Sequence, residues 1–302
     1  MVSGDFMTLQ NAIDEFLIEQ QIRGNSDKTV LYYSRCLGFF ASYNGFGSRC
    51  IGSISICDCK SYLLYLKTKN ITTTTIQTYI RALRSFLSWC YSEGYINTNI
   101  PEQFKLPKAK RKTIDVLTDE EIQRLFSCLN GRDFHNVRNY CIVALMLDSG
   151  LRLNEVVTLN RDKIHIVEGY VIVNGKGDKE RIVPLGMNSK KALLRYMSIV
   201  PSLDIKTPLF VKDTLTPLKQ STIKQLFRRL KVTASIPRLR PHLLRHSFAT
   251  RYLENGGDIY SLQLILGHTS LEMVKKYIHL TNSKTAVNFC AYSPLDKVLK
   301  KR

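Results

Sequence analysis

Residues 241–250 read PHLLRHSFAT, and residues 266–268 read LGH. A helical repeat over the first segment places His242 and Arg245 on one face and leaves the apolar residues between them to face a core. A histidine and an arginine near a helix start suit a phosphate, because the positive helix end and the planar guanidinium attract the same anion. Tyr277 follows nine residues after His268. Taken alone, the basic pair could be incidental and the tyrosine could serve packing.

Two earlier segments add charged residues. Residues 148–155 read DSGLRLNE, in which a spacing of three puts Arg152 and Glu155 on one face of a helix. Lys176 lies between two glycines, in a turn over residues 174–178 that joins two predicted strands. In isolation, the first pattern is typical of a structural ion pair and the second of an exposed hairpin lysine.

Together these segments hold the groups that can break a phosphodiester bond without a metal. Two arginines can bind the non-bridging oxygens and stabilise the extra charge of the pentacoordinate state. A histidine can help to remove the proton of a tyrosine, whose ordinary pKa of ~10 leaves little phenolate at neutral pH. A lysine can protonate the departing sugar oxygen while the tyrosine forms a covalent phosphoenzyme. No metal or cofactor is expected, and the candidate catalytic residues are Arg152, Lys176, His242, Arg245, His268 and Tyr277.

The order of these segments and their amino-acid sequences resemble those of the tyrosine recombinase family, also called phage integrases. The resemblance is strongest to Xer-type members and covers about residues 113–280. It implies a site-specific DNA recombinase in which Arg152 and Arg245 clamp the scissile phosphate and His268 hydrogen-bonds it. Tyr277 would attack to form a 3′-phosphotyrosyl link, with His242 assisting proton transfer at this nucleophile.

The same resemblance implies roles for the neighbouring residues. Lys176 would be the general acid for the 5′-oxygen. Lys179 and Arg181 are interpreted as contacts to the DNA backbone or as hairpin surface, and His246 as structural support. Glu155 would orient Arg152 without touching the DNA.

The composition is that of a basic globular protein. A length of 302 residues suggests about two domains, at roughly 150 residues each. The chain has 44 Lys and Arg against 25 Asp and Glu, a formal net charge of +19. This excess favours a nucleic acid partner, although a ribosomal or membrane-surface protein could show the same balance. No segment approaches the ~18 consecutive apolar residues of a membrane span, and the N-terminus lacks the pattern of a signal peptide. We therefore expect a cytoplasmic protein without membrane contact.

The charge changes at a stretch that contains prolines. Residues 1–100 hold 9 basic and 7 acidic residues, whereas residues 101–302 hold 35 and 18. Pro101 and Pro107 break helical structure between the two halves. We expect a helical domain over residues 1–100, a linker over 101–112 and a catalytic domain over 113–302. The linker is either a solvated connection or a tether lying on DNA through its basic residues, Lys105, Lys108, Lys110, Arg111 and Lys112.

Apolar periodicity predicts the secondary structure. The first half should contain helices around residues 8–22, 27–43 and 55–69, and another from 72–75 to a stop at Gly94. The second half has a capping box at residues 118–121, a buried helix over 139–147, short strands near 164–166, 170–172 and 182, and helices again from about 220. The expected fold is mainly α with a small β-sheet, in an α+β catalytic domain. The resemblance further implies a SAM-like N-terminal core-binding domain that closes with the catalytic domain around DNA as a C-shaped clamp.

Eight cysteines are present, and none forms a CxxC pair. Cys57 and Cys59, which are separated by one residue, have no matching pair at zinc-site spacing. We expect buried free thiols in a reducing compartment. They are Cys36, Cys50, Cys57, Cys59, Cys90, Cys128, Cys141 and Cys290.

The resemblance also implies how the protein assembles. Its double-stranded DNA would carry paired inverted repeats, bound by four copies of the chain or with a related recombinase subunit. Each C-terminal tail would dock on a neighbour, or else pack on its own domain, through Phe289, Leu295, Val298 and Leu299. We expect no further domain ahead of the helical one, which argues against the arm-site-binding integrases. The N-terminal half and the tail favour a mobile-element recombinase, while the target sequence depends on a few side chains that the sequence does not identify.

Two other functions would use similar residues. A type IB topoisomerase shares the chemistry without exchanging strands between duplexes. The similarity of the motifs to those of Xer-type members and the short chain disfavour this function. A DNA-binding regulator with vestigial catalytic residues is disfavoured because all six candidate positions are intact.

Overall fold

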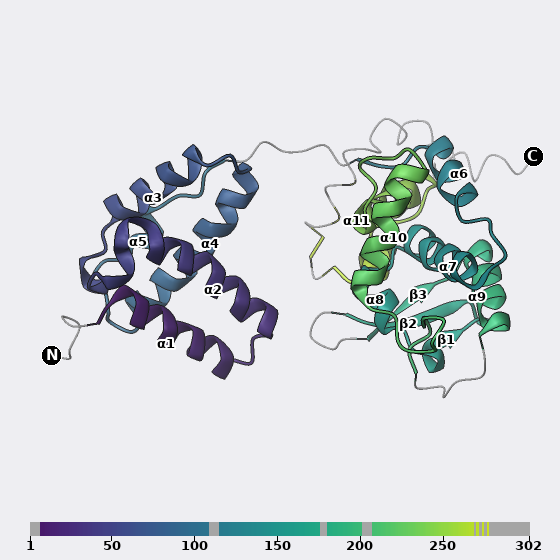
Figure 1. The fold of residues 1–302 in the computed structure, drawn as a ribbon, viewed down its shortest axis with the longest axis horizontal. Helices are drawn as coiled ribbons and strands as arrows, with labels where there is room; N and C mark the ends of the chain where they lie inside the picture. Colours follow the sequence, from purple (N-terminus) through teal and green to yellow (C-terminus); the bar gives the residue numbers. More distant parts are fainter. Residues whose placement is uncertain are drawn as a thin grey trace, which may run out of the picture. The chain divides into compact units, whose positions relative to one another are not determined.

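The computed structural model describes residues 7–108, 115–175, 180–200 and 207–268, together with residues 270, 271, 274 and 277. The chain divides into two compact units, Met1–Lys112 and Thr113–Arg302 (Figure 1). Each unit has its own hydrophobic core.

The first unit is helical throughout its described part. Its four longer helices lie where the apolar periodicity predicts them, and polar side chains at Thr8, Ser55 and Thr72 cap three of them. These helices are α1 (Leu9–Ile22), α2 (Asp27–Ser42), α3 (Ile56–Thr68) and α4 (Thr73–Ser92). Two 3₁₀ segments, η1 (Tyr43–Ser48) and η2 (Ile51–Ser53), and the short helix α5 (Ile100–Gln103) were not predicted, because such short elements have too few residues to show a period.

An aromatic cluster forms the core of the first unit. Phe16 packs against Phe86 and Trp89, with ring centroids 5.5 and 5.4 Å apart, and Phe40 packs edge-on against Tyr62 at 5.0 Å. These rings come from α1, α2, α3 and α4 and are almost completely buried. Burying each large side chain contributes about 1.5–3 kcal/mol, so the cluster holds the four helices together.

The expected linker begins later than the prolines suggested. Pro101 and Phe104 are buried in the first unit, and the Gln77 amide donates a 2.7 Å hydrogen bond to the Pro107 carbonyl. The chain therefore stays on the first unit as far as Pro107. Lys105 is exposed, as is Lys108, while Lys110, Arg111 and Lys112 lie outside the described residues.

The second unit combines helices with one small sheet, which confirms the predicted fold class. Its helices are α6 (Asp119–Ser127), α7 (Phe134–Asp148), α8 (Leu153–Thr158), α9 (Met187–Ile199), α10 (Gln220–Thr233), α11 (Pro241–Glu254) and α12 (Ile259–Leu266), with a 3₁₀ turn η3 (Arg161–Lys163). The predicted capping box is present, with Thr118 accepting from the Glu121 amide and Glu121 accepting from that of Thr118. The buried helix predicted over residues 139–147 is α7, which packs against α9 and α11 (Figure 1).

Three antiparallel strands form the sheet in the order β1 (Ile164–His165), β2 (Tyr170–Asn174) and β3 (Glu180–Pro184). Val171 pairs with Val183 and Val173 with Arg181, so these four residues share one face of the sheet. The three valines are buried, whereas Ile182 on the opposite face is 61% exposed. The inward face of β3 therefore carries Arg181 into the protein, next to α12.

Four of the seven described cysteines are buried, and three are not. Cys36, Cys59, Cys90 and Cys141 are buried free thiols, and Cys50 is half-buried. Cys57 and Cys128 are exposed, which corrects the expectation that all are buried: one lies on the solvent side of the first turn of α3, and the other caps the end of α6. Cys290 lies outside the described residues. No described helix is long and apolar enough to cross a membrane.

Candidate active site

Arg245 lies at the centre of the candidate site, one turn into α11. Its side chain is buried, and it donates 2.6 Å hydrogen bonds to the carbonyl oxygens of Gly150 and Leu266. One of its nitrogens also lies 3.2 Å from Nε2 of His268. Burial, helped by the charge of Arg152, lowers the pKa of Arg245 to about 9, so that it is still a cation at neutral pH. The guanidinium is therefore held between the end of α7 and the end of α12.

Two glycines shape the backbone that Arg245 contacts. Gly150 has a φ of +64°, and a Cβ there would lie 2.4 Å from the Phe248 ring. Gly267 ends α12 with a φ of +60°, and a Cβ there would lie 2.9 Å from the side chain of Arg181. Since only glycine adopts such a conformation without strain, both turns depend on the absence of a side chain. The second turn brings His268 beside Arg245.

Glu155 joins two arginines beneath the site. It accepts 2.8 Å hydrogen bonds from the backbone amide and the guanidinium of Arg152, and two further 2.8 Å bonds from Arg181. Burial alone would raise the pKa of this 3% exposed carboxyl, but the hydrogen bonds and charges of Arg181 and Arg152 lower it to about 2. Arg152 itself is 32% exposed and precedes α8. The buried carboxylate thus fixes an arginine that still reaches solvent.

Arg181 differs from its expected place. It was interpreted as a DNA contact or hairpin surface, yet its side chain is only 11% exposed. Besides its two bonds to Glu155, its Nε donates to the Ile265 carbonyl at 2.7 Å. The alternation of β3 contains a signal for this, because residues 181 and 183 share a face and Val183 is buried.

Tyr277 lies against a histidine that sequence analysis had assigned to support. The Tyr277 hydroxyl is 2.7 Å from Nδ1 of His246, and the tyrosine is 1% exposed. Burial raises the pKa of Tyr277 to about 12, against the opposing charges of Arg245 and Arg152. His242, which was expected to assist this tyrosine, is exposed in the first turn of α11. His242 and His246 are four residues apart and share a helix face, so the spacing could have pointed to both.

The structure brings together four of the six candidate catalytic residues within the second unit, and a fifth, His242, is exposed in the first turn of the same helix as Arg245. Arg152, Arg245 and His268 lie close together around the turns at Gly150 and Gly267. The charges of both arginines lower the pKa of Tyr277, against the effect of its burial. Lys176, the sixth, lies outside the described residues, as does Lys179. No described cluster of His, Cys, Asp or Glu side chains could hold a metal ion. The arrangement can bind an anion next to a tyrosine hydroxyl.

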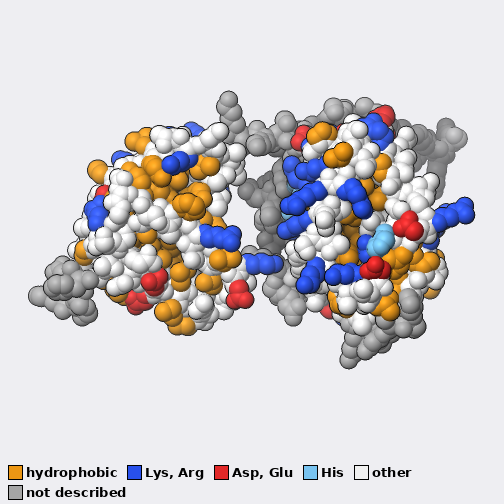
Figure 2. Space-filling model, in the orientation of Figure 1, with side chains coloured by type: hydrophobic (Ala, Val, Ile, Leu, Met, Phe, Trp, Pro, Cys, Tyr) orange, Lys and Arg blue, Asp and Glu red, His pale blue; other side chains and the backbone are white. Residues whose placement is uncertain are grey.

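A basic surface lies on α10. This helix has no Asp or Glu, and it buries Ile223 and Phe227 while exposing Lys224, Arg228 and Arg229. Figure 2 shows Lys and Arg side chains gathered on this part of the second unit. The basic face of α10 was not predicted from the sequence, although a 14-residue amphipathic helix without acidic residues was a usable signal.

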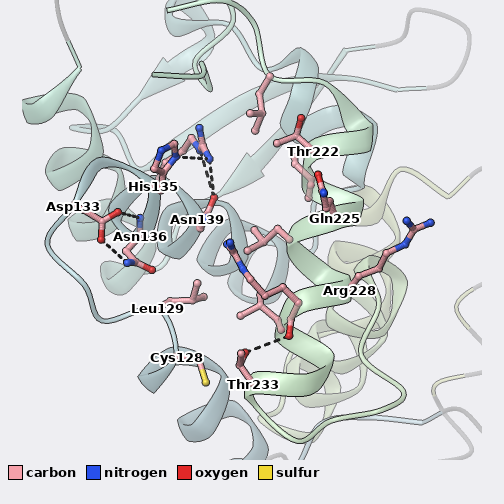
Figure 3. A pocket seen from close by; sticks show the side chains of 16 residues that line it. Cys128, Leu129, Asp133, His135, Asn136, Asn139, Thr222, Gln225, Arg228 and Thr233 are labelled. Carbon is pink, nitrogen blue, oxygen red and sulfur yellow. Dashed lines mark hydrogen bonds between the residues drawn. The ribbon is translucent and has the colours of Figure 1, made fainter. Parts of the chain in front are cut away.

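A cavity of about 1030 Å³ lies between α10 and the start of α7 (Figure 3). Arg138 is one of its lining residues, within 3.3 Å of His135 and donating a hydrogen bond to Asn139, and Asp133 accepts a hydrogen bond from the Asn136 amide. None of the residues that line it belongs to the cluster around Arg245 and Tyr277. The hollow is therefore separate from the candidate reacting centre.

Comparison with known proteins identifies both units. Residues 115–284 match the phage integrase family, and residues 13–94 match the phage integrase N-terminal SAM-like domain. Tyrosine recombinase XerD of Oceanobacillus iheyensis is 32% identical over 295 residues, which cover 95% of this chain and 99% of that protein.

Two solved structures have a similar fold. The Tn1549 transposon integrase in complex with a circular intermediate DNA has a TM-score of 0.74 at 23% identity, covering 90% of this chain and 94% of that one. A lambda integrase tetramer bound to a Holliday junction has a TM-score of 0.71 at 19% identity, covering 89% and 79%.

Proposed function

Because the chain belongs to the phage integrase family of tyrosine recombinases, we propose that Tyr277 is its nucleophile and that Arg152, Arg245 and His268 bind the scissile phosphate. The protein is a site-specific recombinase that cuts and rejoins DNA through a tyrosine intermediate. What remains to be assigned is which side chains perform each step.

One observation carries the assignment. The Tyr277 hydroxyl is buried beside His246, where the charges of Arg245 and Arg152 act on it. Arg245 is fixed by two backbone carbonyls and Arg152 by Glu155, so both guanidiniums are oriented before DNA arrives. Cations that are already oriented stabilise the pentacoordinate phosphate without reorganisation, which is usually the largest contribution to catalysis.

The proposed reaction proceeds in two steps, strand cleavage and strand rejoining. The Tyr277 oxygen attacks phosphorus and forms a 3′-phosphotyrosyl bond, while the bond from phosphorus to the 5′-oxygen breaks. Lys176 would give that oxygen its proton. Rejoining reverses both changes with a 5′-hydroxyl of the partner strand, so no energy-rich cofactor is required. The histidines of α11, His242 and His246, are the candidates for handling the tyrosine proton.

We further propose double-stranded DNA with paired inverted repeats as the substrate, bound by a tetramer. The exposed lysine and arginines of α10 favour a DNA contact on the second unit, and the exposed Lys105 and Lys108 favour one at the end of the first unit. The similar lambda integrase is a tetramer on a Holliday junction, and the similar Tn1549 integrase belongs to a transposon. These comparisons favour a tetrameric synapse and a mobile-element substrate for this cytoplasmic recombinase. The tail that would dock in trans lies outside the described residues.

The test is trapping of the covalent adduct. A binding site is first selected from a pool of random duplexes, and then nicked so that cleavage releases a short fragment. Wild-type protein should form an adduct that peptide mapping places on Tyr277. Tyr277→Phe should bind DNA and form none, and Arg245→Ala should cleave roughly 10²–10³ times more slowly. Tyr260, which is 66% exposed, is the internal control. An adduct on Tyr260, or one formed by Tyr277→Phe, would contradict the assignment.

A further inference from the structure

His246 lies at hydrogen-bonding distance from the reacting oxygen of the proposed nucleophile. Its Nδ1 lies 2.7 Å from the Tyr277 hydroxyl, and the two rings are 5.8 Å apart between centroids and inclined at 47°. The distance is that of a hydrogen bond, and the two tilted rings are not stacked. The contact joins α11 to the segment that follows α12, so it depends on the tertiary fold.

The tyrosine needs a proton acceptor. Burial raises the pKa of Tyr277 to about 12, so at pH 7 only about one molecule in 10⁵ carries a phenolate. A positioned base contributes typically 10²–10⁴-fold to such a step. Arg245 and Arg152 can stabilise the phenolate as it forms, because their charges lower this pKa. As cations they cannot accept its proton.

Two other titratable groups of the site make contacts elsewhere, and a third lies toward solvent. Glu155 is bound to Arg181 and Arg152, and its pKa of about 2 makes it a poor acceptor. His268 directs Nε2 at Arg245, 3.2 Å away. His242 is exposed one turn earlier on α11. The Nδ1 atom of His246, by contrast, lies at hydrogen-bonding distance from the Tyr277 hydroxyl.

We propose that His246 accepts the Tyr277 proton at Nδ1 during strand cleavage and returns it during rejoining. This rests on the proposed function, and it moves to His246 the role that sequence analysis gave to His242. As the proton passes to Nδ1, the tyrosine oxygen bonds to phosphorus and the bond to the 5′-oxygen breaks. That oxygen takes its proton from the general acid. The step requires the neutral tautomer with hydrogen on Nε2.

The experiment compares His246→Asn with His242→Asn in single-turnover adduct formation on the nicked substrate, from pH 6 to 10. Asparagine can place an amide near Nδ1 and keep a hydrogen bond, but it cannot take up the proton. His246→Asn should bind DNA like wild type and cleave at least about 100-fold more slowly at pH 7. Its rate should then rise tenfold per pH unit, because hydroxide must replace the base, while the wild-type rate levels off. His242→Asn should keep the shape of the wild-type profile.

A second substrate separates the base from the acid. A sulfur in place of the bridging 5′-oxygen makes a leaving group that needs no proton. It should restore cleavage by Lys176→Ala and leave His246→Asn defective. The second variant, His246→Ala, should show the same defect, which guards against an effect peculiar to asparagine.

Three results would overturn the proposal. The first is a His246→Asn rate within about threefold of wild type, which would leave the contact only a packing role. The second is faster cleavage by His246→Ala, which would make the contact a lock on the tyrosine. The third is a tenfold rise per pH unit in His242→Asn alone. In all three, a wild-type adduct on Tyr277 would leave the proposed function standing, whereas absence of that adduct would overturn both.

Discussion

Replacing Glu155 with glutamine tests whether the buried carboxylate both stabilises the second unit and orients Arg152. Glutamine keeps the size of the side chain and can still accept hydrogen bonds, but it removes the negative charge between Arg152 and Arg181. Both arginines lie within 2.8 Å of the carboxylate, which is 3% exposed, so little solvent is present to replace the lost charge. Glu155→Gln should therefore weaken folding and cleavage together.

The size of the folding effect follows from the pKa of Glu155. Its fall from 4.5 to about 2 corresponds to about 3–4 kcal/mol in the free energy of unfolding at pH 7, at about 1.4 kcal/mol per pKa unit. Because the folded pKa is the lower one, this stability is present above about pH 4.5 and is lost as pH falls toward 2. The difference in the free energy of unfolding between wild type and Glu155→Gln should thus narrow by about 40% at pH 3.5.

Glu121 provides the matched control. It occupies the same third position of a helix as Glu155, is 8% exposed, and pairs with Arg238 at 2.7 Å. It does not contact the cluster around Arg245. Glu121→Gln should also lower the free energy of unfolding, measured in urea, and should leave the single-turnover cleavage rate of the folded protein unchanged.

The single-turnover cleavage rate of Glu155→Gln should fall by roughly 10²-fold under conditions in which both variants are folded. The reason is that Arg152, no longer held by the carboxylate, is misplaced relative to the scissile phosphate. The reasoning is refuted if the two variants lose cleavage equally. It is also refuted if Glu155→Gln is as stable as wild type at pH 7.

Three further predictions concern the linker, metals and a turn. Neutralising Lys108, Lys110, Arg111 and Lys112 together should make the log–log dependence of DNA binding on salt shallower, by about 0.9 per lost phosphate contact; an unchanged slope would mean a solvated linker. Strand cleavage should persist in excess EDTA without ATP, and its loss while DNA binding is retained would show that the site is misread. Gly150→Ala should lower the free energy of unfolding by at least about 2 kcal/mol, since the added Cβ meets Phe248 in a strained turn. Gly24→Ala, at a similar φ with open space around it, should cost only about 1 kcal/mol in the same urea titration.

Local pattern was enough to predict most of the fold. The helices α1 to α4, the capping box at Thr118 and the β2–β3 hairpin were all predicted from residues close together in the sequence. Hydrophobic period and capping act over a few residues, so they can be recognised without the rest of the chain. The six candidate catalytic residues were likewise found from short motifs.

The partners of those residues came only from the tertiary structure. Arg181 was expected at the surface, but folding of the hairpin against α8 and α12 brings it to Glu155 and to the Ile265 carbonyl. Arg245 is held by carbonyls of Gly150 and Leu266, which no motif links to it. Such contacts join segments far apart in sequence, and a single sequence carries no periodic signal for them.

His242 and His246 show most clearly what the sequence determines and what only the fold determines. Their spacing of four residues puts His242 and His246 on one face of α11, and this much is determined by the sequence. Which of them meets the Tyr277 hydroxyl depends on the path of the chain beyond the turn at Gly267. That path is set by packing, with Val274 and Tyr277 buried against the core of the second unit. The sequence thus determined which chemical groups are present, and only the fold decided which of them touch.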